Sequence, residues 1–281
     1  MDTRTPTTRR PKSRRVSEPS LLRLATEAMG CRFEIAIGGI PGPDVRAAGE
    51  EAIAEIETLH AQFTRFERGS LVSRLNEGGH ERVDAETFAL FELCDEVCVA
   101  SDGAFDINAR GSGRVVLDRS EYRVGVDGTP AVDLGAVAKG YALGRAVLVL
   151  REAGVKWAFL HGGGSSTATI GTRPDGYPWR VTIGVSTAAE PVTIELVDQS
   201  LSVSGDESQA GHIVDPREGG SACPAGLFAA CVGPADPLGA AACDAWATAL
   251  AVLRRRPTDM PDGLSCFLVE DGRWTISAAT C

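Results

Sequence analysis

Alternation of hydrophobic and polar residues predicts most of the β-strands in this chain. Within 28–39 the apolar residues Phe33, Ile35 and Ile37 occupy every second position, which is typical of a strand with one buried face. A Pro-Asp-Gly turn separates two such runs within 168–185. Further strands are predicted at 114–117 and 122–126, within 156–166, twice within 191–205, at 227–233, and as a terminal hairpin within 265–278.

Helical spacing of apolar residues predicts four helices among these strands. They begin near Asp44, at Asp84, within 132–145 and near Ala240, and they end near residues 63, 100, 152 and 254. Asp44 and Asp84 are suitable N-caps, whereas residues 68–79 read as a loop with a short turn. Because the strands come in antiparallel runs and the long helices lie apart from them, the pattern predicts an α+β fold.

The stretch 132–145, VDLGAVAKGYALGR, reads as the end of a buried strand, a glycine turn and the first turns of a helix. Gly135 permits a tight turn, and Gly140 keeps the early helix narrow. A helix N-terminus has free N–H groups and partial positive charge, which suit a phosphate. Asp133 precedes this turn and Lys139 follows it, so the pattern fits a nucleotide site. Taken alone, the local pattern favours an ordinary strand-to-helix junction with a surface lysine.

Asp244 and Thr248 are candidate metal ligands in the last predicted helix. They lie four residues apart and therefore share one helix face. Two hard oxygens directed at one point suit Mg²⁺, which uses few protein oxygens and keeps water and substrate phosphate as its other ligands. A backbone carbonyl in the turn at 135–136 would offer a third oxygen. The alternative is that Asp244 lies in the first turn of its helix and Thr248 only packs.

Two loops hold further candidate residues. His212 lies between a Ser-Gly turn and an Asp-Pro turn, where a histidine is free to carry a proton or contact a ligand. In the alternative interpretation it is a surface histidine bonded to backbone. Phe105 and Asp106, in the sequence GAFD, would grip a planar ring and its polar edge. The alternative for this pair is a capping turn whose phenylalanine belongs to the core.

Composition and charge narrow the class of protein. The 281 residues are 43% hydrophobic and 23% charged, and no apolar run approaches a membrane span, which indicates a soluble globular protein. Residues 1–24 carry a net charge of +5, so the remaining chain carries −15. We therefore expect a disordered basic tail over 1–22 and one acidic domain over 23–281. An acidic body does not suit nucleic acid as the main partner.

The eight cysteines and the N-terminus indicate a cytoplasmic protein. No CxxC pair occurs, and the basic tail lacks the apolar core of an export signal. We expect the cysteines to be reduced and to behave as small hydrophobic residues. A zinc site or a disulfide has no support in their spacing.

Seven short motifs, in their order along the chain, resemble the ApbE family of FAD:protein FMN transferases. The resemblance extends from about Arg23 to the C-terminus and implies an α+β fold with antiparallel sheets flanked by helices and two lobes enclosing a flavin cleft. The motifs are EAMGCRF, FTRFERGSLVSRLN, DGAFD, VDLGAVAKGYALGRA, LHGGGSS, SVSGD…GHIVDPREG and CDAWATALAVL.

The resemblance also implies the ligands and the residues that bind them. Mg²⁺ would be bound by Asp244, Thr248 and the backbone of Ala136. This agrees with the residue pattern of the 133–139 turn and the last helix. The contacts to FAD would fall on Met29, Phe66, Ala104, Phe105, Asp106, Asp133, Lys139, His212 and Ile213.

The activity implied by the resemblance is a magnesium-dependent phosphoryl transfer. FMN would pass from FAD to a Thr or Ser hydroxyl of an acceptor flavoprotein, and AMP would be released. His212 is the first candidate for handling the proton of that hydroxyl, and Asp106 is the second. Two alternatives stay open: a magnesium-dependent FAD pyrophosphatase that uses water, and a non-catalytic FAD-binding protein.

Overall fold

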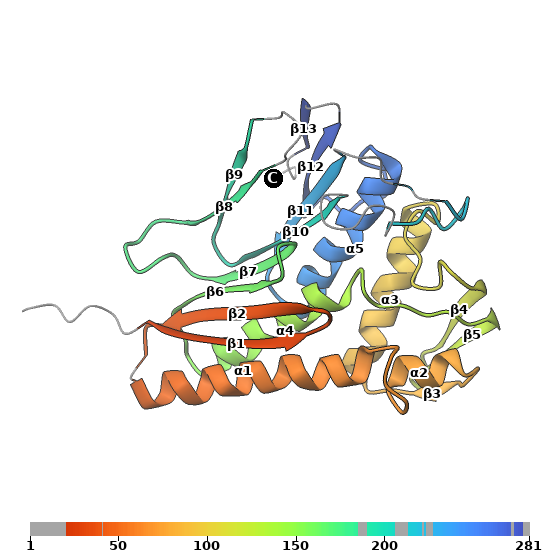
Figure 1. The fold of residues 1–281 in the computed structure, drawn as a ribbon, viewed down its shortest axis with the longest axis horizontal. Helices are drawn as coiled ribbons and strands as arrows, with labels where there is room; N and C mark the ends of the chain where they lie inside the picture. Colours follow the sequence, from red (N-terminus) through yellow and green to blue (C-terminus); the bar gives the residue numbers. More distant parts are fainter. Residues whose placement is uncertain are drawn as a thin grey trace, which may run out of the picture.

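An eight-stranded antiparallel sheet forms the centre of the molecule. The computed structural model describes residues 21–40, 42–184, 190–205, 213–220, 222, 227–270 and 273–277. The sheet has the order β1-β2-β6-β7-β10-β11-β12-β13 (Figure 1). Its strands are β1 (Leu22–Ala28), β2 (Cys31–Gly38), β6 (Trp157–Gly162), β7 (Ser166–Ile170), β10 (Gln199–Gly205), β11 (Phe228–Pro234), β12 (Ser265–Glu270) and β13 (Arg273–Ser277).

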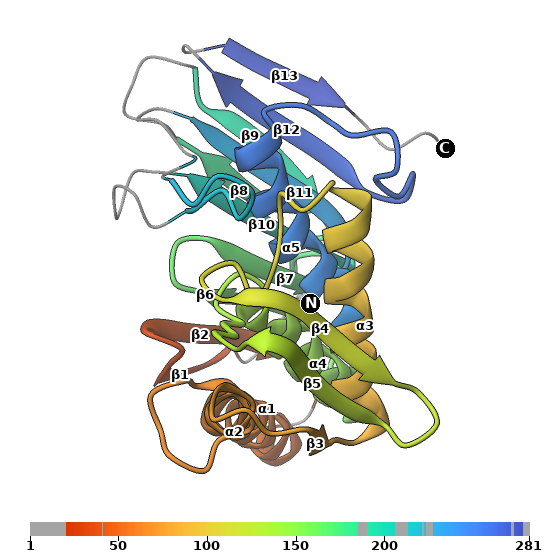
Figure 2. The ribbon, with the colours of Figure 1, turned by 90° about the vertical axis from the view of Figure 1, so that its right-hand side faces the viewer.

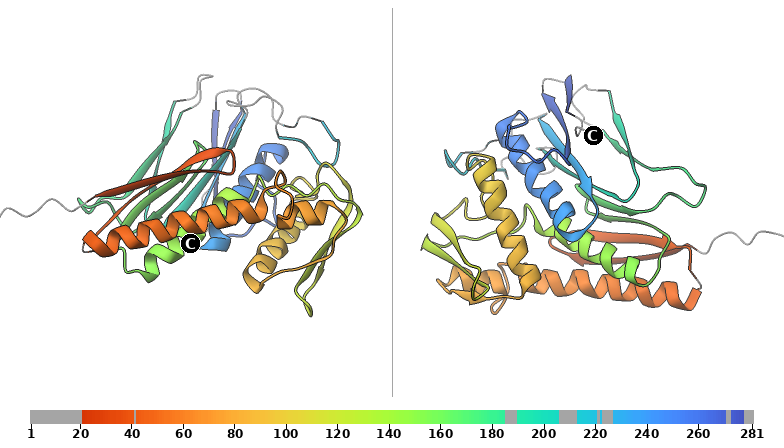
Figure 3. Two further views of the ribbon diagram at one scale, coloured as in Figure 1. Left: turned by 60° about the horizontal axis from the view of Figure 1, so that its bottom comes forward. Right: turned by 180° about the vertical axis from the view of Figure 1, so that it is seen from behind.

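Three helices cover one face of this sheet. The long helix α1 (Gly42–Phe63) lies against β1 and β2 and runs along one side of the molecule, as the view from below in Figure 3 shows. Helix α4 (Ala138–Glu152) packs between α1 and α5 (Pro237–Leu253), and α5 lies on β10 and β11. The apolar stripe predicted for the first helix, including Ile56 and Phe63, is buried here.

Two smaller sheets complete the α+β fold. At one end of the molecule, β3 (Glu81–Arg82), β5 (Arg123–Thr129) and β4 (Ser112–Asp118) lie beside α2 (Leu71–Asn76) and α3 (Ala85–Ala100), as Figure 2 shows. The ribbon of β8 (Trp179–Ile183) and β9 (Val192–Leu196) packs on the sheet face opposite α5, where Ile183 and Leu196 meet Leu201 and Val232. The predicted fold class is therefore confirmed.

Four local predictions differ from the structure. The run 28–39 is not one strand, because Met29 and Gly30 have φ of 50° and 72° and form the turn of the β1–β2 hairpin. Residues 68–79 contain helix α2, whose N-cap Ser70 accepts from the Ser73 N–H. Asp44 lies within the first turn of α1 and does not precede it. Residues 132–134, predicted as the end of a buried strand, belong to no strand of the described structure.

The last helix also begins earlier than predicted. Asp236 is the N-cap of α5, its side chain accepts from the Gly239 N–H, and Pro237 follows in the first turn. Asp244 consequently lies in the interior of the helix and is only 4% exposed. The alternative in which Asp244 lies in the first turn of its helix is therefore wrong.

The structure describes only part of the predicted tail and six of the eight cysteines. Residues 1–20, most of the predicted tail, lie outside the described residues, and Leu22 already belongs to β1. The single domain over 23–281 stays a prediction. The six described cysteines are free, and four of them are buried (Cys94, Cys231, Cys243 and Cys266). No helix in the described part of the chain is long and apolar enough to cross a membrane.

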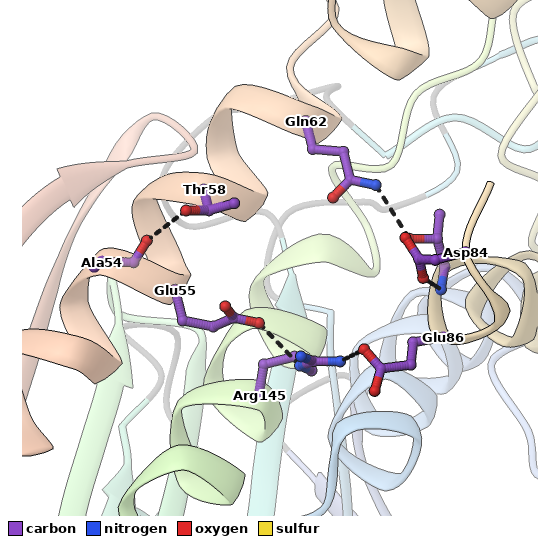
Figure 4. A network of polar contacts seen from close by, with 8 residues as sticks. Ala54, Glu55, Thr58, Gln62, Asp84, Glu86 and Arg145 are labelled. Atoms are coloured by element: carbon purple, nitrogen blue, oxygen red, sulfur yellow. Dashed lines mark hydrogen bonds and ion pairs between the residues drawn. The ribbon is translucent and has the colours of Figure 1, made fainter.

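Arg145 joins three helices through a charged contact (Figure 4). Its Nε lies 2.9 Å from Glu55 Oε1 of α1, and its Nη1 contacts Glu86 Oε2 of α3. The Arg145 side chain is 19% exposed and that of Glu55 23%, so this ion pair is largely shielded from water. A second contact in the figure links α1 to the start of α3, because Gln62 donates to Thr87 Oγ1 over 3.1 Å.

Replacing Arg145 with methionine should lower the free energy of unfolding by about 2 kcal/mol, between the cost of breaking a buried ion pair and an exposed one. The carboxylate of Glu55 would stay shielded without its partner. Chemical denaturation measures the change. Arg180→Met is the matched control, because the pair of Arg180 with Glu195 is 62% and 53% exposed and should contribute less than about 0.5 kcal/mol. Equal effects of the two variants would contradict this role of Arg145.

Candidate active site

One large cavity collects most of the residues predicted from the sequence. It has a volume of about 890 Å³, within the range of small-molecule sites. The β1–β2 turn, the segments 104–110 and 131–139, the glycine loop after β6, the end of β8 and helix α5 all contribute to its wall. The predicted residues that line it are Met29, Ala104, Phe105, Asp106, Asp133, Ala136, Lys139, Ile213, Asp244 and Thr248.

The carboxylate of Asp244 caps the N-terminus of helix α4. Val137 occupies the N-cap position and makes no side-chain cap hydrogen bond, because its side chain has no acceptor. Asp244 of α5 supplies the missing acceptor: the Gly140 N–H donates to Asp244 Oδ2 over 2.9 Å. The positive end of the α4 dipole also favours this negative charge. The turn before α4, predicted to bind phosphate, and the helix α5, predicted to carry the metal ligands, are thus in direct contact.

This cap leaves an oxygen of the turn available to a ligand. In a continuing helix the Gly140 N–H would donate to the carbonyl four residues earlier, that of Ala136. It is directed at Asp244 instead, and Ala136 lines the cavity. Thr248, one turn after Asp244 on the same helix face, also lines the cavity, and its hydroxyl donates to the Asp244 carbonyl over 3.2 Å.

Positive charge gathers at the turn before α4. Lys139 Nζ donates to the Gly135 carbonyl over 3.1 Å, which holds the ammonium group over the turn. Asp133 Oδ1 accepts from the Gly135 N–H, and Asp133 Oδ2 lies 3.4 Å from Nε of Arg65. Arg65 also lines the cavity, and the sequence reasoning did not identify it. No local pattern marks it, because it follows the end of α1 in a loop of mixed charge.

Phe105 and Asp106 also belong to the wall of the cavity. Phe105 is 2% exposed and belongs to the main core, as the alternative interpretation has it, and it also lines the cavity. Its contact with a planar ring stays a prediction. Asp106 Oδ1 accepts from the Asn108 N–H over 2.7 Å. Burial raises the pKa of Asp106 above its ordinary value, since desolvation disfavours the charged carboxylate more than that hydrogen bond favours it.

Phe66 does not line the described cavity, and His212 is not among the described residues. Phe66 is 82% exposed, and the Arg65 guanidinium lies 4.7 Å from the centre of its ring. Its contact with FAD stays a prediction. His212 lies outside the described residues, so its place in the site also stays a prediction.

The structure adds cavity residues from the glycine loop and two strands. Gly163, Gly164 and Ser165 line the cavity after β6, and Ser204 lines it at the end of β10. Ser166 lies directly behind the wall and donates to Asp244 Oδ1 over 3.1 Å. The signal for these residues was present in the sequence as GGGSS and as the alternating serines of QSLSVSG, which place Ser200, Ser202 and Ser204 on one strand face.

The oxygen donors at this cavity fit a hard cation that takes only a few of its ligands from the protein. No group of three or more His, Cys, Asp or Glu gathers in a metal-binding arrangement among the described residues. The candidate donors are instead one carboxylate, one hydroxyl and one carbonyl, from Asp244, Thr248 and Ala136. Mg²⁺ is commonly held by one or two carboxylates together with water and substrate phosphates, so this set suits it.

Comparison with known proteins relates this chain to one family and to solved structures with the same fold. The model of the ApbE family matches residues 29–259. No curated protein matches the sequence. The ApbE protein of Thermotoga maritima superimposes with a TM-score of 0.77 at 22% identity, over 92% of this chain and 97% of that one.

Two further solved structures share this fold. The flavin transferase ApbE of Vibrio cholerae has a TM-score of 0.77 at 20% identity, over 93% of this chain and 98% of that one. The flavinyl transferase ApbE of Pseudomonas stutzeri in its apo form has a TM-score of 0.75 at 20% identity, over 94% and 96% of the two chains. The architecture is therefore common to these proteins over nearly their whole length.

Proposed function

The chain belongs to the ApbE family, and on that premise we propose that it transfers FMN from FAD to a Thr or Ser hydroxyl of an acceptor protein and releases AMP. Two of the similar structures are flavin transferases, which supports the reaction class. One observation of this chain carries the proposal: Asp244 of α5 caps the lysine-bearing turn of α4 at the wall of a cavity of about 890 Å³. A carboxylate, a lysine and a helix N-terminus at one point suit a metal-bound diphosphate.

Asp244, Thr248 and the carbonyl of Ala136 would hold Mg²⁺ in this proposal. Bound there, Mg²⁺ would act as a Lewis acid and neutralise charge on the diphosphate. Lys139 and the positive end of the α4 dipole add positive potential on the same side of the cavity. They are needed because the body of the chain is acidic and would otherwise repel a dinucleotide.

The transfer itself follows from positioning. FAD would lie with its diphosphate across the turn 135–139 and its flavin towards Phe105 and Met29. The acceptor hydroxyl attacks the phosphorus on the FMN side in line with the bond to AMP, and AMP leaves with that bond's electrons. Phosphoryl transfers of this kind depend mainly on orientation and on neutralising charge.

Proton removal from the acceptor hydroxyl is assigned to His212 first and to Asp106 second. A histidine titrates near neutral pH and suits the task. The raised pKa of Asp106 means that this carboxylate binds a proton at a higher pH than an exposed aspartate does. Asp106 would otherwise orient the flavin through its polar edge.

The deciding experiment incubates the protein with FAD, Mg²⁺ and a purified FMN-acceptor domain. We expect flavin fluorescence that stays with the acceptor through denaturing electrophoresis and disappears when a chelator is added. AMP and free FMN formed at a rate that the acceptor does not change would identify a pyrophosphatase. Intact FAD on a yellow protein, despite excess Mg²⁺ and acceptor, would identify a binding protein.

A further inference from the structure

The sheet presents a row of serine hydroxyls to the helix that carries the metal-ligand candidates. Ser200 and Ser202 of β10 are 2% and 1% exposed, and Ser166 of the neighbouring strand β7 is 1% exposed. Ser166 and Ser202 are register partners, so the two strands align their serines. Leu201 and Val203 point to the other face, where the β8–β9 ribbon packs. The serine side of β10 therefore faces α5.

Each of the two candidate ligands of α5 has a serine of β7 or β10 as its partner. Ser166 Oγ donates to Asp244 Oδ1 over 3.1 Å, while the Gly140 N–H donates to Oδ2 over 2.9 Å. Ser204 Oγ lies 3.2 Å from Thr248 Oγ1. The Thr248 proton is directed to the Asp244 carbonyl, so Ser204 is the donor in this second contact.

We propose that Ser166 and Ser204 are positioning residues that orient the Asp244 carboxylate and the Thr248 hydroxyl for a divalent cation. The inference rests on the proposed function, because it concerns the same metal site. Ser166 lies behind the cavity wall and cannot contact the substrate, since it is buried and does not line the cavity. Its hydroxyl donates to Asp244 and lies 3.4 Å from Oγ of Ser165, so it reaches the cavity through these two neighbours.

The physical basis is the distribution of protons and lone pairs. A carboxylate oxygen can accept more than one interaction, so one donor on each oxygen still leaves lone pairs for a cation. With both oxygens bonded, the carboxylate plane is fixed between β7 and α4. The donation from Ser204 likewise leaves one lone pair on the Thr248 oxygen. Partners of this kind around a metal site commonly change its affinity 10- to 100-fold.

Direct Mn²⁺ binding to the full chain tests the proposal without using catalysis as the readout. Mn²⁺ accepts the same oxygen ligands as Mg²⁺, and its free ion is quantified by electron paramagnetic resonance. We expect Asp244→Asn to abolish binding, and Ser166→Ala and Ser204→Ala each to weaken it about 10-fold or more. Ser166→Thr keeps the hydroxyl and should restore binding to within about 3-fold of the unmodified chain.

Ser200→Ala is the matched control. Ser200 belongs to the same row and is equally buried, but its hydroxyl donates to the Pro234 carbonyl and contacts Cys243 Sγ, not a ligand. We expect its Mn²⁺ affinity to stay within about 2-fold. Thermal unfolding of each variant separates a lost fold from a lost site, and a merely structural role of Ser166 would lower the melting temperature without changing the affinity.

Two results would overturn the inference. If Ser166→Ala and Ser204→Ala bind Mn²⁺ as the unmodified chain does while Asp244→Asn does not, the serines do not position the ligands, and the proposed function stands. If the unmodified chain binds no Mn²⁺ and Asp244→Asn still transfers FMN, both the inference and the metal part of the proposed function are wrong.

Discussion

Replacing Asp244 with alanine is expected to abolish FMN transfer, reducing the rate at least about 100-fold, while the chain still folds. The loss follows from the carboxylate's position, because Asp244 is both a ligand candidate and the cap of α4. Alanine would leave the Gly140 N–H and the Ser166 hydroxyl without their acceptor, which costs about 1–3 kcal/mol for each buried group. Flavin fluorescence on the denatured acceptor measures the transfer, and circular dichroism measures the fold.

The variant Asp244→Asn separates the loss of the negative charge from the loss of the helix cap. Asparagine keeps one acceptor oxygen and nearly the same shape, so it retains more of the cap but loses the charge. We expect the same loss of transfer with a smaller loss of stability. Asp236→Asn is the control on the same helix, since asparagine is an equally good N-cap and Asp236 lies outside the cavity wall. Transfer by Asp244→Asn at the unmodified rate in Mg²⁺ would show that the metal assignment is wrong.

Replacing Gly140 with alanine should lower both stability and transfer. A Cβ at Gly140 would lie 2.2 Å from the Ala240 carbonyl oxygen and 3.1 Å from Asp244 Cβ, so α4 and α5 would have to separate. Overpacking of this kind costs about 1–3 kcal/mol. Separation also lengthens the Gly140–Asp244 hydrogen bond, and we therefore expect transfer to fall about 10-fold or more. Denaturant titration and the transfer assay measure the two effects.

Gly144→Ala distinguishes the site from the general packing of the helices. Its Cβ would lie 2.5 Å from Pro237 Cα and 2.6 Å from the Asp236 carbonyl oxygen, again between α4 and α5. This contact is one turn further from the site, so stability should fall to a similar extent and transfer should fall less. If Gly140→Ala loses stability but transfers FMN at the unmodified rate, the spacing of the two helices does not control the site.

The parts of the site that follow from local spacing could be predicted from the sequence. Asp244 and Thr248 share a helix face because four residues make about one helical turn, and this geometry needs no tertiary information. The same holds for the glycine turn before Lys139. The start of α5 was predicted three residues late because Pro237 and Leu238 precede the alanine run that marked the helix. With a start at Ala240, Asp244 would lie near the beginning of the helix. In the structure it is buried in the helix interior.

The contacts between distant segments could not be predicted in this way. Asp244 and Gly140 are 104 positions apart, and Ser166 and Asp244 are 78 apart. One clue was readable, because a helix that begins after Val137 has no side-chain acceptor of its own and must find one elsewhere. Arg65 carried no such clue, since its pairing with Asp133 depends on how α1 ends against the turn before α4.

The cap across 104 residues has a consequence for biosynthesis. The turn that bears Lys139 leaves the ribosome long before α5 does, and until then the Gly140 N–H of α4 has no carboxylate to accept from it. A chain that ends before α5 lacks Asp244 and Thr248, and it therefore lacks two of the three proposed metal ligands, however well its N-terminal half is folded. The proposed site is therefore complete only after the last helix has been synthesised and has packed on α4.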